Sequence, residues 1–540
     1  FVGAAWNQEM EDYCAEGDIN ITTMLYEKIL RQDWDVGAVR LEHEIHDLMG
    51  QQDRNGIPFN VKDAEALAYE LQDSADQLTA KIVAHFGRWW KPEKKKIIKP
   101  LWEDAEGINA EKTYAKPEPE FGEDTSRSVW AVVSVPKKKR TLVKGEQCPV
   151  SYSPDAPYCK VTMTEFNPGS RPQIIDRLTV TNNWHPVDFT EKGNPEVSDS
   201  VLRKLTHIPM ALELAELFYF NKRLGQVATG KGAWLRKVTD AGLIHAYVNV
   251  GGTISGRASH VDPNLAQVPK VKTKKKKLPD GDEIKYIAKG REGDHGFECR
   301  RLFYVPVEWG TMVGADLEGI ELRCFGEQLF KYDNGAYLDI VLTRDIHAYN
   351  QQVAELPTRD NAKTFIYALI YGAGDIKLGS IVNPLADEEE QRQIGKKLRE
   401  RFMANLPAFA KVVKDIQRWA KRGYLPGLDG RKLYVRSPHS ALNTKLQSDA
   451  ALIAKKWVLL TRDRLEDAGF YQGWDQHFVN LLWIHDEQQL GVRHGSAGEN
   501  PVQTVKNIAI AAAAEAGKFF GYQCPISADA KHGQNWAETH

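Results

Sequence analysis

Carboxylate side chains stand at two places in the sequence where apolar runs stop. Asp316 follows "TMVGA", and His485, Asp486 and Glu487 separate "FVNLLWI" from "QQLGV". Adjacent carboxylates repel one another and apolar surroundings make their ionisation costly, so a bound cation would relieve both penalties. An aspartate from each of two strands can hold two Mg²⁺ ions about 3.5–4 Å apart, an arrangement suited to phosphoryl transfer. Taken one at a time, Asp316 is typical of a cap residue and the triplet is typical of an ordinary polar turn.

A second pattern places cations and phenols at four-residue spacing. In "RDNAKTFIYALIYGAG" the residues Arg359, Lys363, Tyr367 and Tyr371 advance by about 40° per step, so they share one broad helix face. Thr358 precedes them as a predicted N-cap. A helix N-terminus favours anions, and two added cations predict an oligophosphate site with the phenols deeper, near a base or sugar. An amphipathic helix with a salt-bridged face explains the spacing alone; the carboxylates favour the phosphate site.

These residues need strands and a helix to position them, and the sequence predicts both. The two apolar runs around residues 485–487 predict a β-hairpin with the carboxylates at its tip. Helical periodicity is clear over residues 61–86, and helices resume from about residue 198 to 229. Afterwards short apolar strands alternate with long helices, which predicts an α+β fold. The lysine-rich residues 272–284 predict an exposed loop or hairpin.

Composition narrows the class of protein. With 540 residues the chain is expected to form two to four domains. Its net charge of −2 means that any surface for a polyanion must be local. The six cysteines show no zinc-binding spacing, which is typical of free thiols in a reducing compartment, and no apolar run of about 18 residues predicts a membrane span. The first residues, from Phe1, look like a cut into a longer sequence.

Several stretches together carry a family resemblance. Asp316 with Glu321 and Arg323, the Arg359–Tyr371 helix, and the triplet at 485–487 resemble the three polymerase motifs of family A (Pol I-like) DNA polymerases. More narrowly, the chain is similar to the replicative DNA polymerases of T-seven-like phages in the stretches "DNGAY", "RDNAKTFIY", "GLDGRK", "VRSPH", "ALNT", "QNWAETH" and "SGRASHVDPNLAQVP". The similarity covers most of residues 200–540, is moderate over 40–90 and is weak over 91–163.

The resemblance implies a right-hand polymerase fold with an antiparallel palm sheet and helical fingers and thumb. The implied domains are a remnant of a 3′–5′ exonuclease domain (1–33), a thumb (34–237) with an insertion (91–163), a palm (238–327 and 456–540) and fingers (328–455). The implied function is template-directed addition of dNTPs to a primer 3′-hydroxyl in phage genome replication, within the host cytoplasm and with no membrane partner.

The resemblance also implies roles for individual residues. Two Mg²⁺ ions would be held by Asp316, Asp486 and the Leu317 carbonyl. The dNTP would be held by Glu321, His347, Arg359, Lys363, Tyr367 and Tyr371, with Lys363 also counted as catalytic. Glu321 and Tyr371 would exclude a 2′-hydroxyl, and the Tyr367 hydroxyl would permit dideoxynucleotides. The primer–template would be contacted by Arg257, Asn264, Gln267, Asn443, Gln447 and His485; side-chain donors of this kind can test minor-groove acceptors without reading sequence.

The chain departs from the family in three places. A 3′–5′ exonuclease of the family uses carboxylates from several segments, of which the sequence shows only the last, and no proofreading is expected from this chain. In that segment the family places a tyrosine four residues before the final aspartate, whereas Tyr13 is five residues before Asp18. The insertion at 91–163 matches the phage polymerases in place but hardly in residues. It is expected either to bind host thioredoxin or another processivity factor or to clamp DNA through its lysines; a replicative helicase–primase is a further expected partner. The segment 270–297 is longer than the family predicts and suggests no function.

Two other functions compete with this interpretation. An RNA polymerase of related fold would lack the acidic residue at position 321, so Glu321 argues against it. An inactive DNA-binding scaffold would tolerate loss of the carboxylates, and all of them are present.

Overall fold

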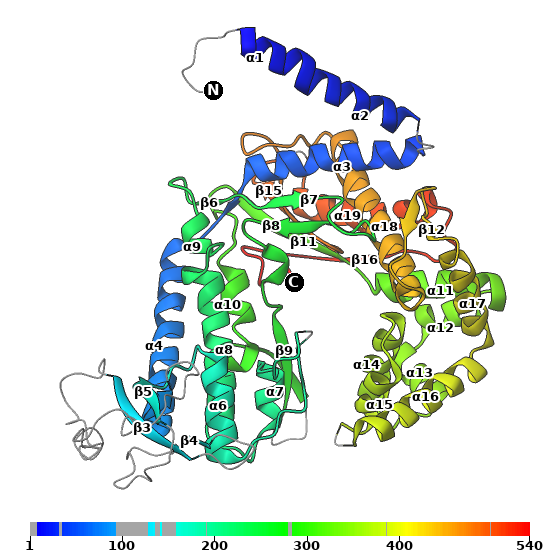
Figure 1. The fold of residues 1–540 in the computed structure, drawn as a ribbon. Coiled ribbons are helices and arrows are strands. Elements are labelled where there is room, and N and C mark those ends of the chain that lie inside the picture. Colours follow the sequence, from blue (N-terminus) through cyan, green and yellow to red (C-terminus); the bar gives the residue numbers. More distant parts are fainter. Residues whose placement is uncertain are drawn as a thin grey trace, which may run out of the picture. The chain divides into compact units, whose positions relative to one another are not determined.

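The structure is a computed structural model that describes residues 8–31, 35–92, 128–134, 141–142, 158–190, 192–278, 283–384, 386–496 and 498–540. The chain divides into two compact units, residues 1–64 with 234–540 and residues 65–233 (Figure 1). Each unit contains its own buried hydrophobic cluster. Within the described residues, no helix combines the length and the apolar character needed to cross a membrane.

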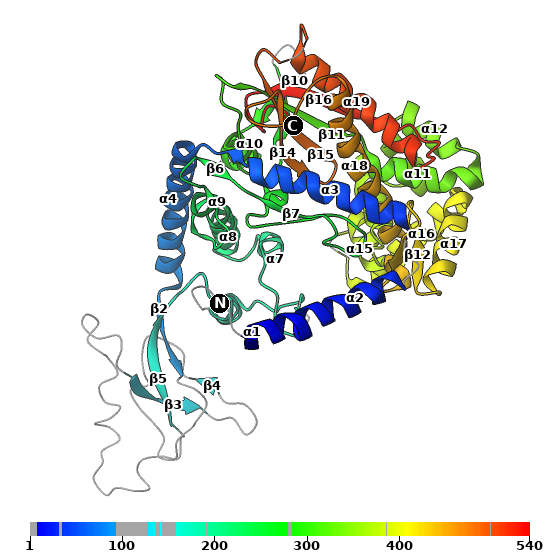
Figure 2. The same cartoon turned by 90° about the horizontal axis from the view of Figure 1, so that it is seen from above.

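A four-stranded antiparallel sheet forms the centre of the larger unit. Its strands, in spatial order, are β14 (Phe478–Ile484), β15 (Glu487–Arg493), β11 (Gly310–Leu317) and β16 (Ala528–Gly533). Helix α19 (Pro501–Phe519) packs on β11 and β16, and α3 (Val36–Asn55) packs on β14. Figure 2 shows α3 beside α18 (Ala441–Asp467), with which it is in contact. Because helices cover the sheet, β14 and β15 are buried along almost their whole length rather than at alternate residues.

Strand β15 carries consecutive polar residues inside this apolar sheet. The Gln488 amide donates to Thr461 Oγ1 at 3.1 Å, and Gln489 accepts a hydrogen bond from Thr539 Oγ1 at 2.7 Å. Buried amides require such partners. These bonds therefore fix which residues of β15 face which neighbours.

A run of helices separates β11 from the β14–β15 hairpin. It comprises α11 (Ile320–Asp333), α12 (Ala336–Thr343), α13 (Ile346–Ala354), α14 (Arg359–Ile370), α15 (Asp375–Val382), α16 (Glu388–Asn405) and α17 (Pro407–Ala420). The side chains of Asp345, Thr358 and Asp387 cap α13, α14 and α16 by accepting backbone N–H bonds. Phenylalanine rings from four of these helices pack at centroid separations of 5.5–5.6 Å, which joins the helices into one core.

Short paired strands occupy residues 243–288 of the larger unit. Strand β6 (Leu243–Ile244) pairs with β1 (Ile57–Pro58), and β7 (Tyr247–Asn249) pairs with β8 (Ser259–Val261). The 3₁₀ turn η4 (Leu265–Gln267) follows, and then the hairpin of β9 (Lys272–Lys277) and β10 (Glu283–Ala288). The remaining short elements are η5 (Gly290–Gly293), α10 (Gly296–Arg301), β12 (Tyr424–Pro426), β13 (Lys432–Tyr434), η6 (Pro438–Ser440) and α9 (Trp234–Lys237).

The smaller unit combines helices with a second antiparallel sheet. Its helices are most of α4 (Val61–Phe86), with α6 (Arg171–Asn182), α7 (Asp199–Lys204), α8 (Ala211–Leu224) and η3 (Gly225–Thr229). Its strands are β2 (Arg88–Pro92), β5 (Tyr158–Glu165), β3 (Ser128–Ser134) and β4 (Thr141–Leu142), in that spatial order. The Arg177 guanidinium lies over the Trp89 ring at 4.1 Å and joins α6 to the start of β2.

The structure confirms the α+β class, the helix over 61–86, the carboxylate-tipped hairpin and the lysine-rich hairpin. It corrects the start of the second helical stretch, because α6 already begins at Arg171. That helix has Pro172 in its first turn and a weak apolar periodicity, so its sequence did not signal it. Most of the predicted insertion at 91–163 lies outside the described residues.

The predicted thumb, residues 34–237, draws on both units. The predicted exonuclease remnant forms α1 (Gln8–Asp12), η1 (Tyr13–Ile19) and α2 (Asn20–Leu30) among the residues that are described.

Candidate active site

The carboxylates singled out in the sequence meet at one edge of the central sheet. Asp316 is next to last in β11 and is paired in register with Glu487 of β15. The Leu317 N–H donates to the Asp486 carbonyl, with 2.9 Å between nitrogen and oxygen. His485 has a φ of 57° and turns the chain between β14 and β15 in the left-handed region. Two segments far apart in sequence therefore place Asp316 and Asp486 at neighbouring strand ends.

The electrostatics of this edge favour a bound cation. Burial, together with the charges of Asp486 and Glu487, raises the pKa of Asp316 to about 7. Burial and the charge of Glu487 also raise the pKa of Asp486. Both carboxyls therefore resist ionisation until a positive charge arrives, and hard oxygen ligands of this kind suit Mg²⁺. The residues present fit a divalent-cation site.

Glu487 is neutralised by the protein itself. Its burial would raise its pKa, but the hydrogen bond with His540 and the charge of Arg300 overcome this and hold the pKa at about 2. Arg300 Nη1 lies 3.2 Å from Glu487 Oε1, His540 Nδ1 lies 3.2 Å from Oε2, and Trp536 Nε1 also donates to Oε1. Asp316, Glu487 and His540 can bring one ligand atom each within 4.8 Å of one another, but Glu487 already has these partners.

The buried network around Glu487 was not predicted from the sequence. A glutamate within an apolar run signals a hidden partner, since an unpaired buried charge is strongly unfavourable. Nothing near Glu487 in the sequence indicates which cation is its partner. Arg300 lies nearly two hundred positions away and His540 more than fifty.

The predicted oligophosphate helix is α14. Thr358 Oγ1 accepts from the Asn361 N–H at 3.1 Å, so the helix begins where the sequence predicts. Arg359 and Lys363 are both exposed on its first turns. Arg359 pairs with Asp345 at 2.6 Å, which holds the pKa of Asp345 at about 2, whereas Lys363 has no carboxylate partner among the described residues. The salt-bridged alternative thus describes only one of the two cations.

Aromatic residues continue this face toward the carboxylates. The Tyr367 and Tyr371 rings are 6.3 Å apart, and the His347 ring of α13 lies 6.2 Å from Tyr367. Burial and the nearby charges of Arg359 and Lys363 lower the pKa of His347, so it is neutral at physiological pH. Burial, followed by the charges of Glu321 and Asp486, raises the pKa of Tyr367, so its hydroxyl stays protonated.

Glu321 joins three segments of the chain. From the first turn of α11, its Oε1 accepts from Arg257 Nη2 at 2.5 Å and its Oε2 accepts from the Tyr371 hydroxyl at 2.5 Å. Burial and the Glu321 carboxylate raise the pKa of Tyr371, so its hydroxyl remains a donor. The three side chains hold one another in a fixed arrangement beside the Asp486 edge, where Arg257 and Glu321 also act electrostatically on Asp486.

The six predicted DNA-contacting residues fall into two places. His485 packs against His260 of β8 with ring centroids 5.5 Å apart, and Gln447 of α18 accepts from Ser255 at 3.5 Å, so both lie near Arg257. Asn443, one turn before Gln447, has a buried Oδ1 with no hydrogen-bond partner among the described residues. Asn264 instead caps η4 by accepting from the Ala266 N–H at 3.1 Å, and Gln267 is the exposed last residue of that turn.

Comparison with known proteins identifies the family of this chain. A model of DNA polymerase family A matches residues 155–538. The DNA-directed DNA polymerases of Enterobacteria phage T3 and Escherichia phage T7 are each 36% identical to the chain over its whole length and over 78% of their own. DNA polymerase I of Geobacillus stearothermophilus is 25% identical over 69% of this chain and 40% of that protein.

One solved structure confirms the fold at lower identity. The POL domain of Pol1 from M. smegmatis, in complex with DNA primer-template and dNTP, matches 92% of this chain and 70% of its own with a TM-score of 0.62 and 17% identity. The predicted polymerase fold is therefore correct. From the motifs, the sheet edge and these relatives together, the chain belongs to DNA polymerase family A and is a DNA-directed DNA polymerase.

Proposed function

We propose that this polymerase extends a primer 3′-hydroxyl with dNTPs during phage genome replication, in the cytoplasm of the host cell. The observation that carries the proposal is the Leu317–Asp486 backbone bond, because it brings the Asp316 and Asp486 segments together beside Glu321. The phage relatives support the replicative role, and the solved relative with DNA primer-template and dNTP supports those ligands.

Asp316, Asp486 and the Leu317 carbonyl would hold two Mg²⁺ ions. The raised pKa values of Asp316 and Asp486 support this, since a cation would stabilise both charged carboxylates. When bound, the ions supply charge neutralisation for the attacking oxygen, the transferred phosphoryl group and the leaving pyrophosphate. Glu487 itself is paired with Arg300, so it is not left as an unpaired buried charge beside these carboxylates.

The chain's own residues bind and orient the reactants. Arg359, Lys363 and His347 bind the triphosphate on the exposed start of α14, where Lys363 offsets charge on the departing phosphates. Glu321 and Tyr371 close the space beside the sugar, and Tyr367 offers a hydroxyl where a 3′-hydroxyl is missing. The 3′-hydroxyl of the primer then attacks the α-phosphate in line as pyrophosphate leaves.

The DNA-binding residues surround this centre. Arg257, Asn443, Gln447 and His485 contact the primer–template near the Glu321 arrangement, and Asn264 and Gln267 contact it from η4. In the proposed division, the palm is 238–327 with 456–540, the fingers are 328–455, and the thumb is 34–237. The insertion at 91–163 binds thioredoxin or another processivity factor, or clamps DNA directly, and a helicase–primase is a further partner.

Primer extension tests the proposal. Asp316→Ala and Asp486→Ala are expected to lower single-nucleotide addition at least about a thousandfold in Mg²⁺, because two-metal chemistry needs both carboxylates. Asp467→Ala, an exposed carboxylate at the far end of α18, is the matched control and should extend normally. Normal extension by either of the first two variants would refute the proposed site, provided that each still binds primer–template DNA.

A further inference from the structure

The β9–β10 hairpin concentrates positive charge on a two-stranded ribbon. Five of the six residues of β9 are lysines, and Lys285 lies on β10. Every β9 residue after Lys272 is exposed, as are Glu283–Ile287 on β10. None of the roles proposed above uses this hairpin.

The pairing register sorts these lysines onto two faces. Residues directly opposite each other in an antiparallel pair share a face. One face carries the pairs Lys272–Ala288, Lys274–Tyr286 and Lys276–Ile284. The other face, here called the lysine face, carries Thr273–Ile287, Lys275–Lys285 and Lys277–Glu283.

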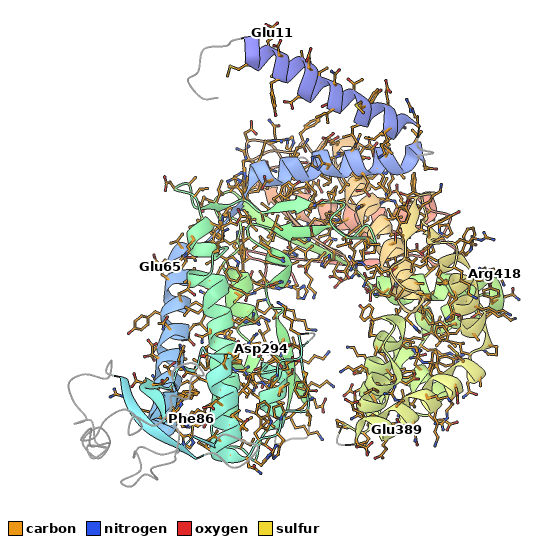
Figure 3. All side chains as sticks on the ribbon, viewed as in Figure 1. Glu11, Glu65, Phe86, Asp294, Glu389 and Arg418 are labelled. Atoms are coloured by element: carbon orange, nitrogen blue, oxygen red, sulfur yellow. The ribbon has the colours of Figure 1, made fainter. Side chains whose placement is uncertain are left out.

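The first face is largely neutralised by carboxylates from the following turn. Lys272 pairs with Asp294, and Lys274 lies 3.1 Å from Glu292, which also accepts from the Tyr286 hydroxyl at 2.7 Å. Asp294 is labelled in Figure 3. These contacts tie this side of the ribbon to the body of the larger unit.

The lysine face keeps its positive charge. Its one carboxylate, Glu283, pairs with Lys275 at 2.9 Å. Lys277 and Lys285 have no carboxylate partner among the described residues. Lys275 and Lys285 stand directly opposite each other, where like charges repel, and Glu283 offsets only one of the two. The face therefore has the charge pattern of a surface for a polyanion.

The base of the hairpin is fixed to the candidate active site. Arg300 donates from Nε to the Pro269 carbonyl at 3.2 Å while its Nη1 binds Glu487. The Gly290 N–H donates to Glu298 at 2.8 Å, and the Lys270 carbonyl would lie 2.0 Å from a Cβ at Gly296, so the strands enter and leave in close contact. In Figure 1 the hairpin extends from the central sheet toward the same end of the larger unit as α14–α16.

We propose that the lysine face binds the phosphate backbone of the primer–template duplex and adds affinity that does not depend on sequence. The inference rests on the proposed function, and it follows from position as well as charge: β9 begins five residues after Gln267, the end of the segment proposed to grip the DNA. A lysine ammonium is a point charge on a flexible side chain, so it can bind backbone phosphates whatever the base sequence. The negative charge of Glu283 weakens the binding of phosphate to this face.

Equilibrium binding of a labelled primer–template, measured in chelator without dNTPs, tests the proposal. Each phosphate neutralised contributes about 0.9 to the slope of log affinity against log salt, so Lys277→Ala/Lys285→Ala should lower the slope by about 1.8. Between about 50 and about 200 mM salt, the double variant should then lose about 12-fold less affinity than the parent. Glu283→Gln should bind more tightly than the parent.

Lys506→Ala/Lys518→Ala removes the same charge from α19, which packs on the sheet away from the hairpin, and should leave the slope unchanged. An unaltered slope in Lys277→Ala/Lys285→Ala would overturn the proposal and would favour an acidic protein as the ligand of the lysine face. An equal fall in the slope of the α19 control would also overturn it. Because binding is measured without catalysis, the proposed chemistry can fail in primer extension while this result stands.

Discussion

Removing the Glu321 side chain should weaken the selection of deoxynucleotides over ribonucleotides. Glu321 is held from both oxygens, by Arg257 and by the Tyr371 hydroxyl, each at 2.5 Å, and its side chain is only 14% exposed. A carboxylate held at both oxygens in this way cannot readily move aside for a 2′-hydroxyl placed against it. Glu321→Ala removes this obstacle while leaving Asp316 and Asp486 untouched.

The magnitude follows from the hydroxyl that the wild-type site cannot accommodate. A hydroxyl buried without a partner costs about 1–3 kcal/mol, which corresponds to about 5- to 150-fold in relative rate. The ratio of kcat/KM for a ribonucleotide to that for its deoxynucleotide should rise by this factor in Glu321→Ala. Tyr371→Phe should raise it less, because Arg257 still holds the carboxylate.

Single-nucleotide primer extension with each nucleotide in turn measures both values of kcat/KM. Glu321→Gln is the matched control: it preserves the shape of the side chain and should retain most of the discrimination. If Glu321→Ala binds primer–template normally yet shows the wild-type ratio, then Glu321 does not stand beside the sugar and the reasoning fails.

Three further predictions concern other parts of the chain. Tyr367→Phe should lower the ratio of dideoxynucleotide to deoxynucleotide incorporation by about tenfold, the worth of one hydrogen bond, and an unchanged ratio would contradict the role given to its hydroxyl. Burial and the neighbouring His485 lower the pKa of His260 from 6.5 to about 4, so the unfolded chain takes up a proton before the folded one and stability is lost as pH falls through this window. The free energy of unfolding should fall by about 1.4 kcal/mol by about pH 5.5. Urea unfolding should show a smaller fall in His260→Gln, and the same pH profile in the variant and the parent would argue against this role of His260. Deleting residues 92–162 should shorten primer-extension products while sparing single additions; loss of single additions would mean that this segment is structural.

The sequence predicted the elements whose signals are local. The four-residue spacing and Thr358 placed α14 correctly, and the two apolar runs predicted the β14–β15 hairpin. It could not supply pairings between distant segments, such as Arg300 with Glu487 or Arg257 with Glu321, because nothing near either residue specifies its partner. Helix α6 was missed for a different reason: with few apolar repeats, it depends on tertiary contacts around Leu178 for its stability.

The double burial of β14 and β15 sets unequal limits on how this region can vary in evolution. When both faces of a strand are covered, as along β14 and β15, a shift by one residue keeps its apolar side chains buried, so burial alone does not select the alignment. The buried glutamine bonds and the left-handed residue at 485 make that selection. Conservative exchanges among the apolar side chains should therefore accumulate in descendants of this sequence. A codon gained or lost between 484 and 487 should be purged, since the resulting protein would fold with its acidic residues rotated out of reach of Asp316.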